Sequence, residues 1–298
     1  MKFFVTGVGG QLGHDVIKEL LKRGHQCVGT DILDECPNIE ASYVKLDITK
    51  EKETECAIVS ISPDVVVHCA AWTAVDLAED EENVEKVRSI NVGGTKNIAN
   101  ACKKIDCKMI YISTDYVFDG EGDNPWDADC KEYNPINVYG QSKLDGEKAV
   151  VAALDKYFVV RIAWVFGKNG KNFIKTMLSL SEKYETLRVV SDQIGTPTYT
   201  YDLARLLVDM GESEKYGYYH ATNEGGYISW YEFACEIFRS AGKEMNVIPV
   251  TTAEYGASKA KRPFNSRLDK GKLTENGFEP LPHWKDALCR YLSEIGVK

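Results

Sequence analysis

The sequence lacks the long apolar runs and the basic excess that mark two large classes of protein. No run approaches the roughly 18 apolar residues of a membrane span, and the first strand-like stretch begins at Lys2, so we expect neither a membrane helix nor a signal peptide. Lys and Arg number 36 against 45 Asp and Glu, a formal net charge of −9. This balance disfavours a general nucleic-acid or membrane surface.

The sequence also lacks paired cysteines and clustered histidines. Its nine cysteines are odd in number and form no CxxC pair, so they indicate reduced thiols rather than disulfides or zinc ligands. The five histidines are scattered without the spacing of metal ligands. We therefore expect a cytoplasmic protein, and we predict no metal site.

Glycine, in contrast, is concentrated near the N-terminus. A short apolar strand is followed by Gly7, Gly10 and Gly13, and then by the amphipathic pattern of a helix. Such a turn lets a pyrophosphate approach the backbone at the N-terminus of the helix. A second strand over 26–31 ends in Asp31, where an acid about 20 residues beyond the turn can bind the adenosine ribose. The context predicts a dinucleotide site.

A tyrosine and a lysine lie four residues apart, at Tyr139 and Lys143, and so share one face of any helix that carries them. A phenol titrates near pH ~10, and an adjacent ammonium could supply the roughly 4 kcal/mol that lowers its pKa by about 3 units. Such a tyrosine can exchange a proton with a carbonyl oxygen while a hydride reaches the carbon. The pair indicates dehydrogenase chemistry, although an exposed helix pair is the alternative.

Strand and helix patterns alternate along the chain. Strands are predicted at 26–31, 43–46, 64–69, 108–113, 157–165 and 217–222, and helices at 50–61, 84–104 and from 139. Continuous apolar runs such as 65–67 and 158–160 suit strands that are covered on both faces. The pattern predicts an α/β fold of the Rossmann type, with a doubly wound parallel sheet.

From about residue 169 the pattern breaks into shorter pieces. We predict a dinucleotide-binding domain over 1–168 and about 196–228. A smaller, interleaved C-terminal domain for the substrate is predicted over about 169–195 and 229–298.

Several motifs resemble those of the extended short-chain dehydrogenase/reductase superfamily and, within it, the dTDP-4-dehydrorhamnose reductase family. They lie at 10–13, 70–76, 113–120, 139–143, 192–198 and 262–268. The first and fourth are typical of the superfamily, and the others of the reductase branch. The resemblance implies NAD(P)H-dependent reduction of the 4-keto group of dTDP-4-dehydro-β-L-rhamnose to dTDP-L-rhamnose.

The resemblance also implies which residues contact the cofactor. They are Gly7, Gly10, Gln11, Leu12, Asp31, Asp47, Ile48, Ala70, Ala71, Thr73, Asn91, Tyr139 and Lys143. Asp31 would lie near the 2′-phosphate of NADPH, and the segment 30–34 has no arginine to neutralise that phosphate. We therefore expect NADH to be used at least as well as NADPH.

A catalytic hydroxyl should accompany Tyr139 and Lys143 at the end of a strand. Ser113 and Thr114 are both candidates from their position, and the resemblance implies Thr114. The related 4,6-dehydratases carry an Asp-Glu pair after this threonine, whereas this chain has Asp115 and Tyr116. The missing glutamate favours simple reduction over elimination of water.

For the sugar nucleotide, the resemblance implies a set of contacts that ends in the C-terminal motif. They are Thr73, Val75, Thr114, Asp115, Tyr116, Trp164, Arg262 and Asn265. A packing role in the core is the alternative for Trp164. Trp72 stands where some members have histidine, and Asp15 is the one position that matches a glutamate that binds metal at a subunit interface in some members.

The expected partner is thus a dTDP-sugar, with no nucleic acid, no membrane and a possible homodimer. Two alternatives stay open. One is a regulatory subunit that keeps the fold without catalysis, and the other is a reductase or epimerase of a different nucleotide sugar. The intact Thr114, Tyr139 and Lys143 favour the reductase over the regulatory subunit.

Overall fold

A seven-stranded parallel sheet forms the centre of the computed structural model, which describes residues 1–36, 39–256 and 258–297. The strand order is β11-β6-β5-β4-β1-β2-β3, and every neighbouring pair is parallel. The strands are β1 (Lys2–Thr6), β2 (Gln26–Asp31), β3 (Ser42–Lys45), β4 (Val65–His68), β5 (Lys108–Thr114), β6 (Tyr157–Ile162) and β11 (Gly217–His220). The predicted doubly wound α/β fold is confirmed.

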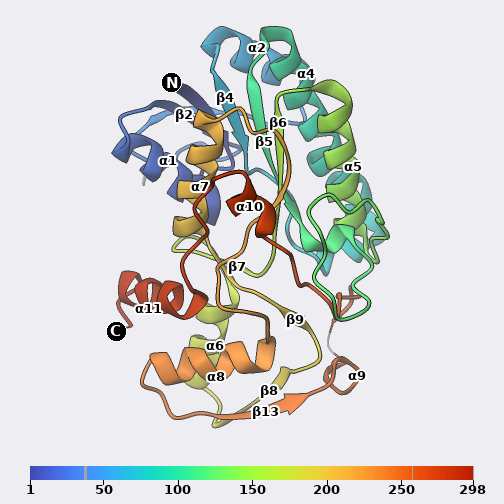
Figure 1. Ribbon diagram of the computed structural model, residues 1–298, viewed down its shortest axis with the longest axis vertical. Helices are drawn as coiled ribbons and strands as arrows, with labels where there is room; N and C mark the ends of the chain where they lie inside the picture. Colours follow the sequence, from blue (N-terminus) through green and yellow to red (C-terminus); the bar gives the residue numbers. More distant parts are fainter. Residues whose placement is uncertain (37–38, 257, 298) are drawn as a thin grey trace.

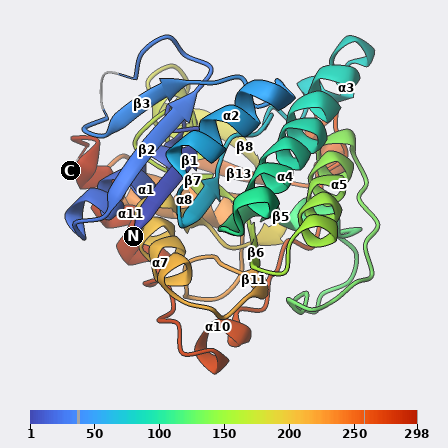
Figure 2. The same cartoon turned by 90° about the horizontal axis from the view of Figure 1, so that it is seen from above.

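Helices cover both faces of this sheet (Figure 2). One face carries α1 (Gln11–Lys22) and α7 (Thr200–Glu212), and the other carries α2 (Glu51–Ile61), α4 (Thr95–Ile105) and α5 (Val138–Ala153). Because successive side chains of a strand point to opposite faces, Phe3 and Val5 pack under α1 while Phe4 packs under α2 and α4. This double burial explains the continuous apolar runs of the strands.

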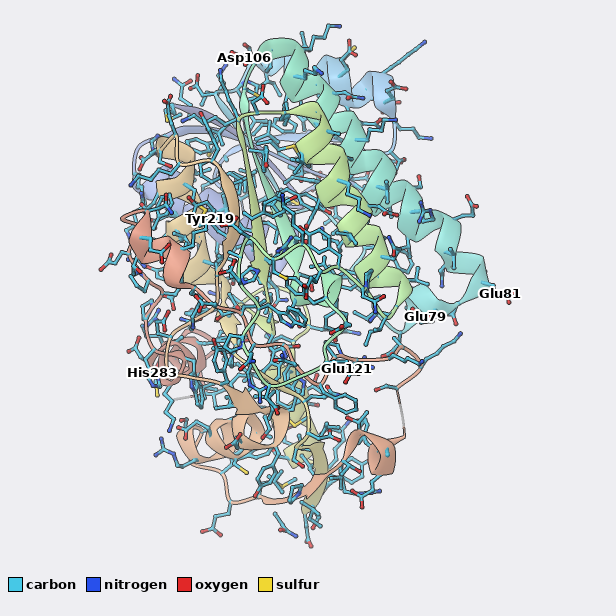
Figure 3. All side chains as sticks on the ribbon, turned by 45° about the vertical axis from the view of Figure 1, so that its right-hand side comes forward. Glu79, Glu81, Asp106, Glu121, Tyr219 and His283 are labelled. Atoms are coloured by element: carbon cyan, nitrogen blue, oxygen red, sulfur yellow. The ribbon has the colours of Figure 1, made fainter. Side chains whose placement is uncertain are left out.

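The chain reverses its direction of winding at β1. It first adds β2 and β3 on one side of β1 and then β4, β5 and β6 on the other. In open parallel sheets the ligand crevice lies beyond the carboxyl ends of the strands at such a reversal. In Figure 3, Asp106, which precedes β5, is labelled near the top of the molecule, and Glu121, which follows β5, lies in its lower half, so β5 runs from the top toward the second body.

A second body of short strands and helices lies beyond this edge of the sheet, in the lower part of Figure 1. Its strands are β7 (Val165–Phe166), β8 (Thr186–Val190), β9 (Ile194–Gly195), β10 (Thr198–Tyr199), β12 (Ile228–Ser229) and β13 (Asn246–Val250). Its helices are α6 (Phe173–Ser181), α8 (Trp230–Ser240), α9 (Thr252–Tyr255) and α11 (Trp284–Glu294), while α10 (Gly271–Glu275) packs near β11. This body has its own apolar core, centred on Phe166, Phe233 and Tyr291.

Two predicted elements differ from the observed ones. The helix predicted over 84–104 is three consecutive pieces, α3 (Glu81–Arg88), a π-helical turn η2 (Ser89–Gly94) and α4. The strand predicted over 157–165 stops at Ile162, because Trp164 adopts a left-handed φ of 50° that ends the extended backbone. Val165 then pairs with Thr198 outside the main sheet.

Two short 3₁₀ turns complete the secondary structure, η1 (Leu77–Glu79) and η3 (Asp115–Val117). Among the described residues, no helix is both long and apolar enough to cross a membrane.

Candidate active site

A cleft of about 1410 Å³ runs along the carboxyl edge of the sheet and reaches the second body. Most of the residues predicted from the sequence line it. They are Gly7, Gly10, Gln11, Leu12, Asp31, Asp47, Ile48, Ala70, Ala71, Thr73, Val75, Thr114, Asp115, Tyr116, Tyr139, Lys143 and Trp164. Residues that lie far apart in the sequence therefore meet in one cavity, as the end-of-strand rule for parallel sheets requires.

The glycine turn forms one end of this cleft, between β1 and α1. Gly7 has a φ of 71°, and a Cβ placed there would lie 2.7 Å from the backbone nitrogen of Ala70. A Cβ on Gly13 would lie 2.4 Å from the carbonyl oxygen of Gly7, so only glycine allows the helix to sit this close. Gly10 caps α1 without a side-chain hydrogen bond, which leaves the first amides of the helix free for an anion. The cradle fits a pyrophosphate.

Asp31 lies beside this turn at the end of β2. One carboxylate oxygen accepts a hydrogen bond from the Gly9 amide at 3.0 Å, and the other accepts one from the Ile32 amide at 2.8 Å. A carboxylate offers about four acceptor positions, so Asp31 can still accept hydrogen bonds from the two hydroxyls of a ribose. On the next strand end, Asp47 accepts two hydrogen bonds from Thr49, and Ile48 packs against Gly94.

A buried polar chain joins the ends of β1 and β4 beneath the cleft. The Thr6 hydroxyl lies 2.8 Å from Nδ1 of His68 and accepts a hydrogen bond from the Ala70 amide at 3.1 Å. Nε2 of His68 lies 3.0 Å from the Thr95 hydroxyl. Burial, helped by the charge of Lys143, lowers the pKa of His68 to about 3. His68 is therefore a neutral packing residue that links the two strand ends.

The residues predicted to be catalytic, on β5 and α5, also line the cleft. Asn137 caps α5 by accepting a hydrogen bond from the Gly140 amide at 2.7 Å, and the first turns of this helix carry Tyr139 and Lys143. Thr114 ends β5, and its hydroxyl donates to Asp115 at 2.9 Å. The Ser113 hydroxyl donates to the buried carboxylate of Glu147, and both Ser113 and Thr114 line the cleft, so the choice of Thr114 as the catalytic hydroxyl stays a prediction.

Burial controls the ionisation of Tyr139 and Lys143. It lowers the pKa of the Lys143 ammonium to about 7, against the opposing effects of Glu147 and Cys69. The Lys143 nitrogen lies 4.2 Å from the centre of the Tyr111 ring. Burial raises the pKa of the Tyr139 phenol, and the charge of Asp115 acts in the same direction. The spacing of Tyr139 and Lys143 predicted a lowered pKa of the phenol, but desolvation raises this pKa, and the phenol stays protonated at neutral pH.

Glu147 is a third polar residue on the face of α5 that carries Tyr139 and Lys143, and it was not predicted from the sequence. Glu147 is fully buried and accepts hydrogen bonds from Ser113 at 2.5 Å and from Nε and a terminal nitrogen of Arg161 at 2.9 and 2.8 Å. Its spacing of four residues after Lys143 was a usable signal. Through Glu147, α5 is fixed to β5 and β6 directly behind the reactive groups.

Trp164 and Trp230 form one wall of the cleft. Their rings stack with centres 3.7 Å apart, and Trp164 is held in its left-handed conformation. A Cβ on Gly195 would lie 2.9 Å from the Trp164 ring, so the indole is confined on that side also. Strained residues of this kind persist where the surroundings over-determine them. Trp230 begins α8 in the second body, and no feature of the sequence pointed to it.

Three predicted contact residues do not line the cleft. The Asn91 side chain accepts a hydrogen bond from the Trp72 amide and donates to the Trp72 carbonyl and the Ser142 hydroxyl. Arg262 makes a two-point ion pair with Asp76 at 3.1 and 2.7 Å. Asn265 is buried and hydrogen-bonded to the loop over 121–124 and to Arg267. Their predicted contacts with cofactor and substrate stay predictions.

The sheet order, the glycine turn after β1 and the cleft beyond the carboxyl ends of the strands together define a Rossmann-type α/β protein. A family model described as RmlD substrate binding domain matches residues 1–297, and the chain belongs to that family.

Individual relatives agree with this family assignment over nearly their full length. A dTDP-4-dehydrorhamnose reductase of Aggregatibacter actinomycetemcomitans is 38% identical over 300 residues, covering 96% of this chain and 97% of that protein. The crystal structure of a dTDP-4-dehydrorhamnose reductase from Clostridium acetobutylicum has a TM-score of 0.91 and 40% identity, covering 99% of each chain. That of a dTDP-4-dehydrorhamnose reductase from Bacillus anthracis in complex with NADP has a TM-score of 0.88 and 38% identity, covering 98% of this chain and 99% of that one.

Proposed function

We propose that this chain is an NAD(P)H-dependent reductase that converts dTDP-4-dehydro-β-L-rhamnose to dTDP-L-rhamnose. The observation that carries the proposal is the arrangement of Thr114, Tyr139 and Lys143 in the same cleft as the glycine turn and Asp31. The names of the relatives support the same reaction. The first turn of α1 would bind the pyrophosphate of the cofactor, and Asp31 its adenosine ribose.

The reaction needs a hydride donor and a proton donor, and the bound nicotinamide cofactor supplies the hydride. Tyr139 is protonated at neutral pH, which is the form that donates a proton to the carbonyl oxygen as the alcohol forms. Thr114 holds the carbonyl oxygen by a hydrogen bond. Lys143, when charged, stabilises the phenolate left by proton transfer and binds the nicotinamide ribose.

The two residues after Thr114 separate reduction from elimination. Asp115 is buried and one of its carboxylate oxygens has no hydrogen-bond partner among the described residues. Tyr116 packs edge-on against Tyr139, with ring centres 5.8 Å apart, in the place where a dehydratase carries its glutamate. With tyrosine at this position, the site lacks the glutamate that removes a proton from the sugar ring in a dehydratase.

The finer assignments belong to the same proposal. Thr73, Val75, Asp115, Tyr116 and Trp164 would contact the sugar, and the second body would form the substrate domain over about 169–195 and 229–298. NADH should serve at least as well as NADPH, because Asp31 opposes a 2′-phosphate. A cytoplasmic location and a homodimer stay predictions.

Turnover tests the proposal directly. The full chain is mixed with NADH or NADPH and with the 4-keto sugar nucleotide made enzymatically from dTDP-glucose by a dehydratase and an epimerase. We expect loss of NADH absorbance together with formation of dTDP-L-rhamnose, and no reaction with dTDP-glucose itself. Folded protein that consumes neither cofactor in the presence of the keto sugar would refute the reductase.

The same assay separates the alternatives. A regulatory subunit would bind cofactor without oxidising it, and an epimerase would interconvert sugars without net loss of NADH. A reductase of another nucleotide sugar would consume NADH only when that sugar replaces the 4-keto-rhamnose nucleotide.

A further inference from the structure

Lys45 is a basic residue at the adenosine end of the cleft to which the sequence analysis gave no role. It is the last residue of β3, and in the parallel register it lies directly opposite Asp31. Paired residues of adjacent strands point to the same face of a sheet. Lys45 and Asp31 both line the cleft, so an ammonium and a carboxylate flank the place where the adenosine ribose would lie.

The present partner of Lys45 is weakly held. Its ammonium lies 2.5 Å from a carboxylate oxygen of Asp34, but the two side chains are 58% and 89% exposed. Ion pairs this exposed contribute little to stability, because water screens them and long side chains lose freedom when they pair. Lys45 can therefore leave Asp34 for a stronger anion at low cost.

The other lysines of the cleft lie elsewhere. Lys143 is buried at the reactive end, and Lys86 lies over the Trp72 ring at 5.5 Å. Lys171 follows Gly170, which packs against Gln11 at the start of α1. Among the described residues that line the cleft, Lys45 is thus the cation beside Asp31.

We propose that Lys45 binds the 2′-phosphate of NADPH, exchanging Asp34 for the phosphate and offsetting the repulsion from Asp31. This inference rests on the proposed use of a nicotinamide dinucleotide, and it refines the expectation drawn from the absence of arginine in 30–34. Asp31 favours a free ribose and Lys45 favours a phosphorylated one. The chain therefore accepts both NADH and NADPH. Asp34 and the 2′-phosphate compete for Lys45, and this competition sets the ratio of the two cofactor affinities.

The test measures binding of two adenosine nucleotides that differ only in the 2′-phosphate, 5′-AMP and adenosine 2′,5′-bisphosphate, by titration calorimetry on the full chain. Lys45→Met should weaken binding of the bisphosphate about three- to tenfold and leave 5′-AMP within about twofold. Asp34→Asn should strengthen binding of the bisphosphate about two- to threefold, because the competing carboxylate is gone. The double variant should behave like Lys45→Met alone.

Lys52→Met is the matched control, since Lys52 is an exposed lysine of α2 outside the cleft and its loss changes the net charge equally. Added salt should reduce the discrimination by Lys45, as expected for an exposed charge. Equal affinities of Lys45→Met and the wild type for the bisphosphate would overturn the inference, as would an equal loss in Lys52→Met or failure of the wild type to bind either nucleotide. Turnover is measured separately, so an inactive chain that still shows the Lys45 effect would refute the reductase but not this site.

Discussion

The buried Glu147–Arg161 ion pair should be the most sensitive point of the nucleotide-binding fold. Both side chains are 0% exposed, and the Arg161 guanidinium lies 4.8 to 5.1 Å from the ring centres of Phe118, Tyr133 and Tyr218. Glu147→Ala would remove the carboxylate and leave the guanidinium in an aromatic cage. We expect the free energy of unfolding to fall by about 3–5 kcal/mol, because an unpaired charge is then buried.

Urea unfolding followed by circular dichroism measures this change. Glu55→Ala is the matched control, since Glu55 pairs with Lys104 on the surface, where the two side chains are 46% and 58% exposed. Its loss should cost at most about 1 kcal/mol. The double variant Glu147→Leu/Arg161→Met removes both charges and should recover much of the stability. Equal, small losses in Glu147→Ala and Glu55→Ala would refute the argument.

Three further variants test the site. Tyr139→Phe should lower turnover roughly 10²- to 10⁴-fold at saturating substrate, with cofactor binding by fluorescence near normal; wild-type turnover would rule out its role as acid. Burial raises the pKa of Asp115 to about 6, so its contribution to stability is present below about pH 4 and is lost as pH rises through 6. At pH 7, the free energy of unfolding of Asp115→Asn, measured with urea, should therefore exceed that of the wild type by about 1–3 kcal/mol. At pH 4 the two proteins should be equally stable. Gly13→Ala should weaken NADH binding, measured by fluorescence titration, by at least about tenfold, because the added Cβ would displace the Gly7 carbonyl. Unchanged affinity would contradict the close packing of α1 against the turn after β1.

Much of the nucleotide end could be predicted from the sequence, because it depends on local chemistry. Gly7 must adopt a left-handed conformation and Gly13 must leave room for a carbonyl, and both requirements appear as glycine at fixed spacing after a strand. Asp31 ends its strand as predicted. The Tyr139–Lys143 face is a local property of one helix.

The sequence predicted less where contacts are long-range. It gave no sign that Trp230 would stack on Trp164, because 66 positions separate them and the contact depends on how the second body packs. It also assigned Arg262 and Asn265 to the substrate from their motif, and these contacts stay predictions; the structure adds that Arg262 pairs with Asp76 and that Asn265 donates to loop carbonyls. Motif membership identified these residues but could not show which way their side chains point.

The ionisation of the reactive groups shows the same division. The sequence by itself determined the parallel fold, the nucleotide turn and the presence of a tyrosine and a lysine on one helical face, since these follow from periodicity and local spacing. Only the tertiary structure decided that Lys143 is buried enough for its pKa to fall to about 7, that Tyr139 stays protonated, and that Glu147 fixes their helix to the sheet. Desolvation and buried pairing depend on every element packed around a group, and spacing along the chain does not contain that information.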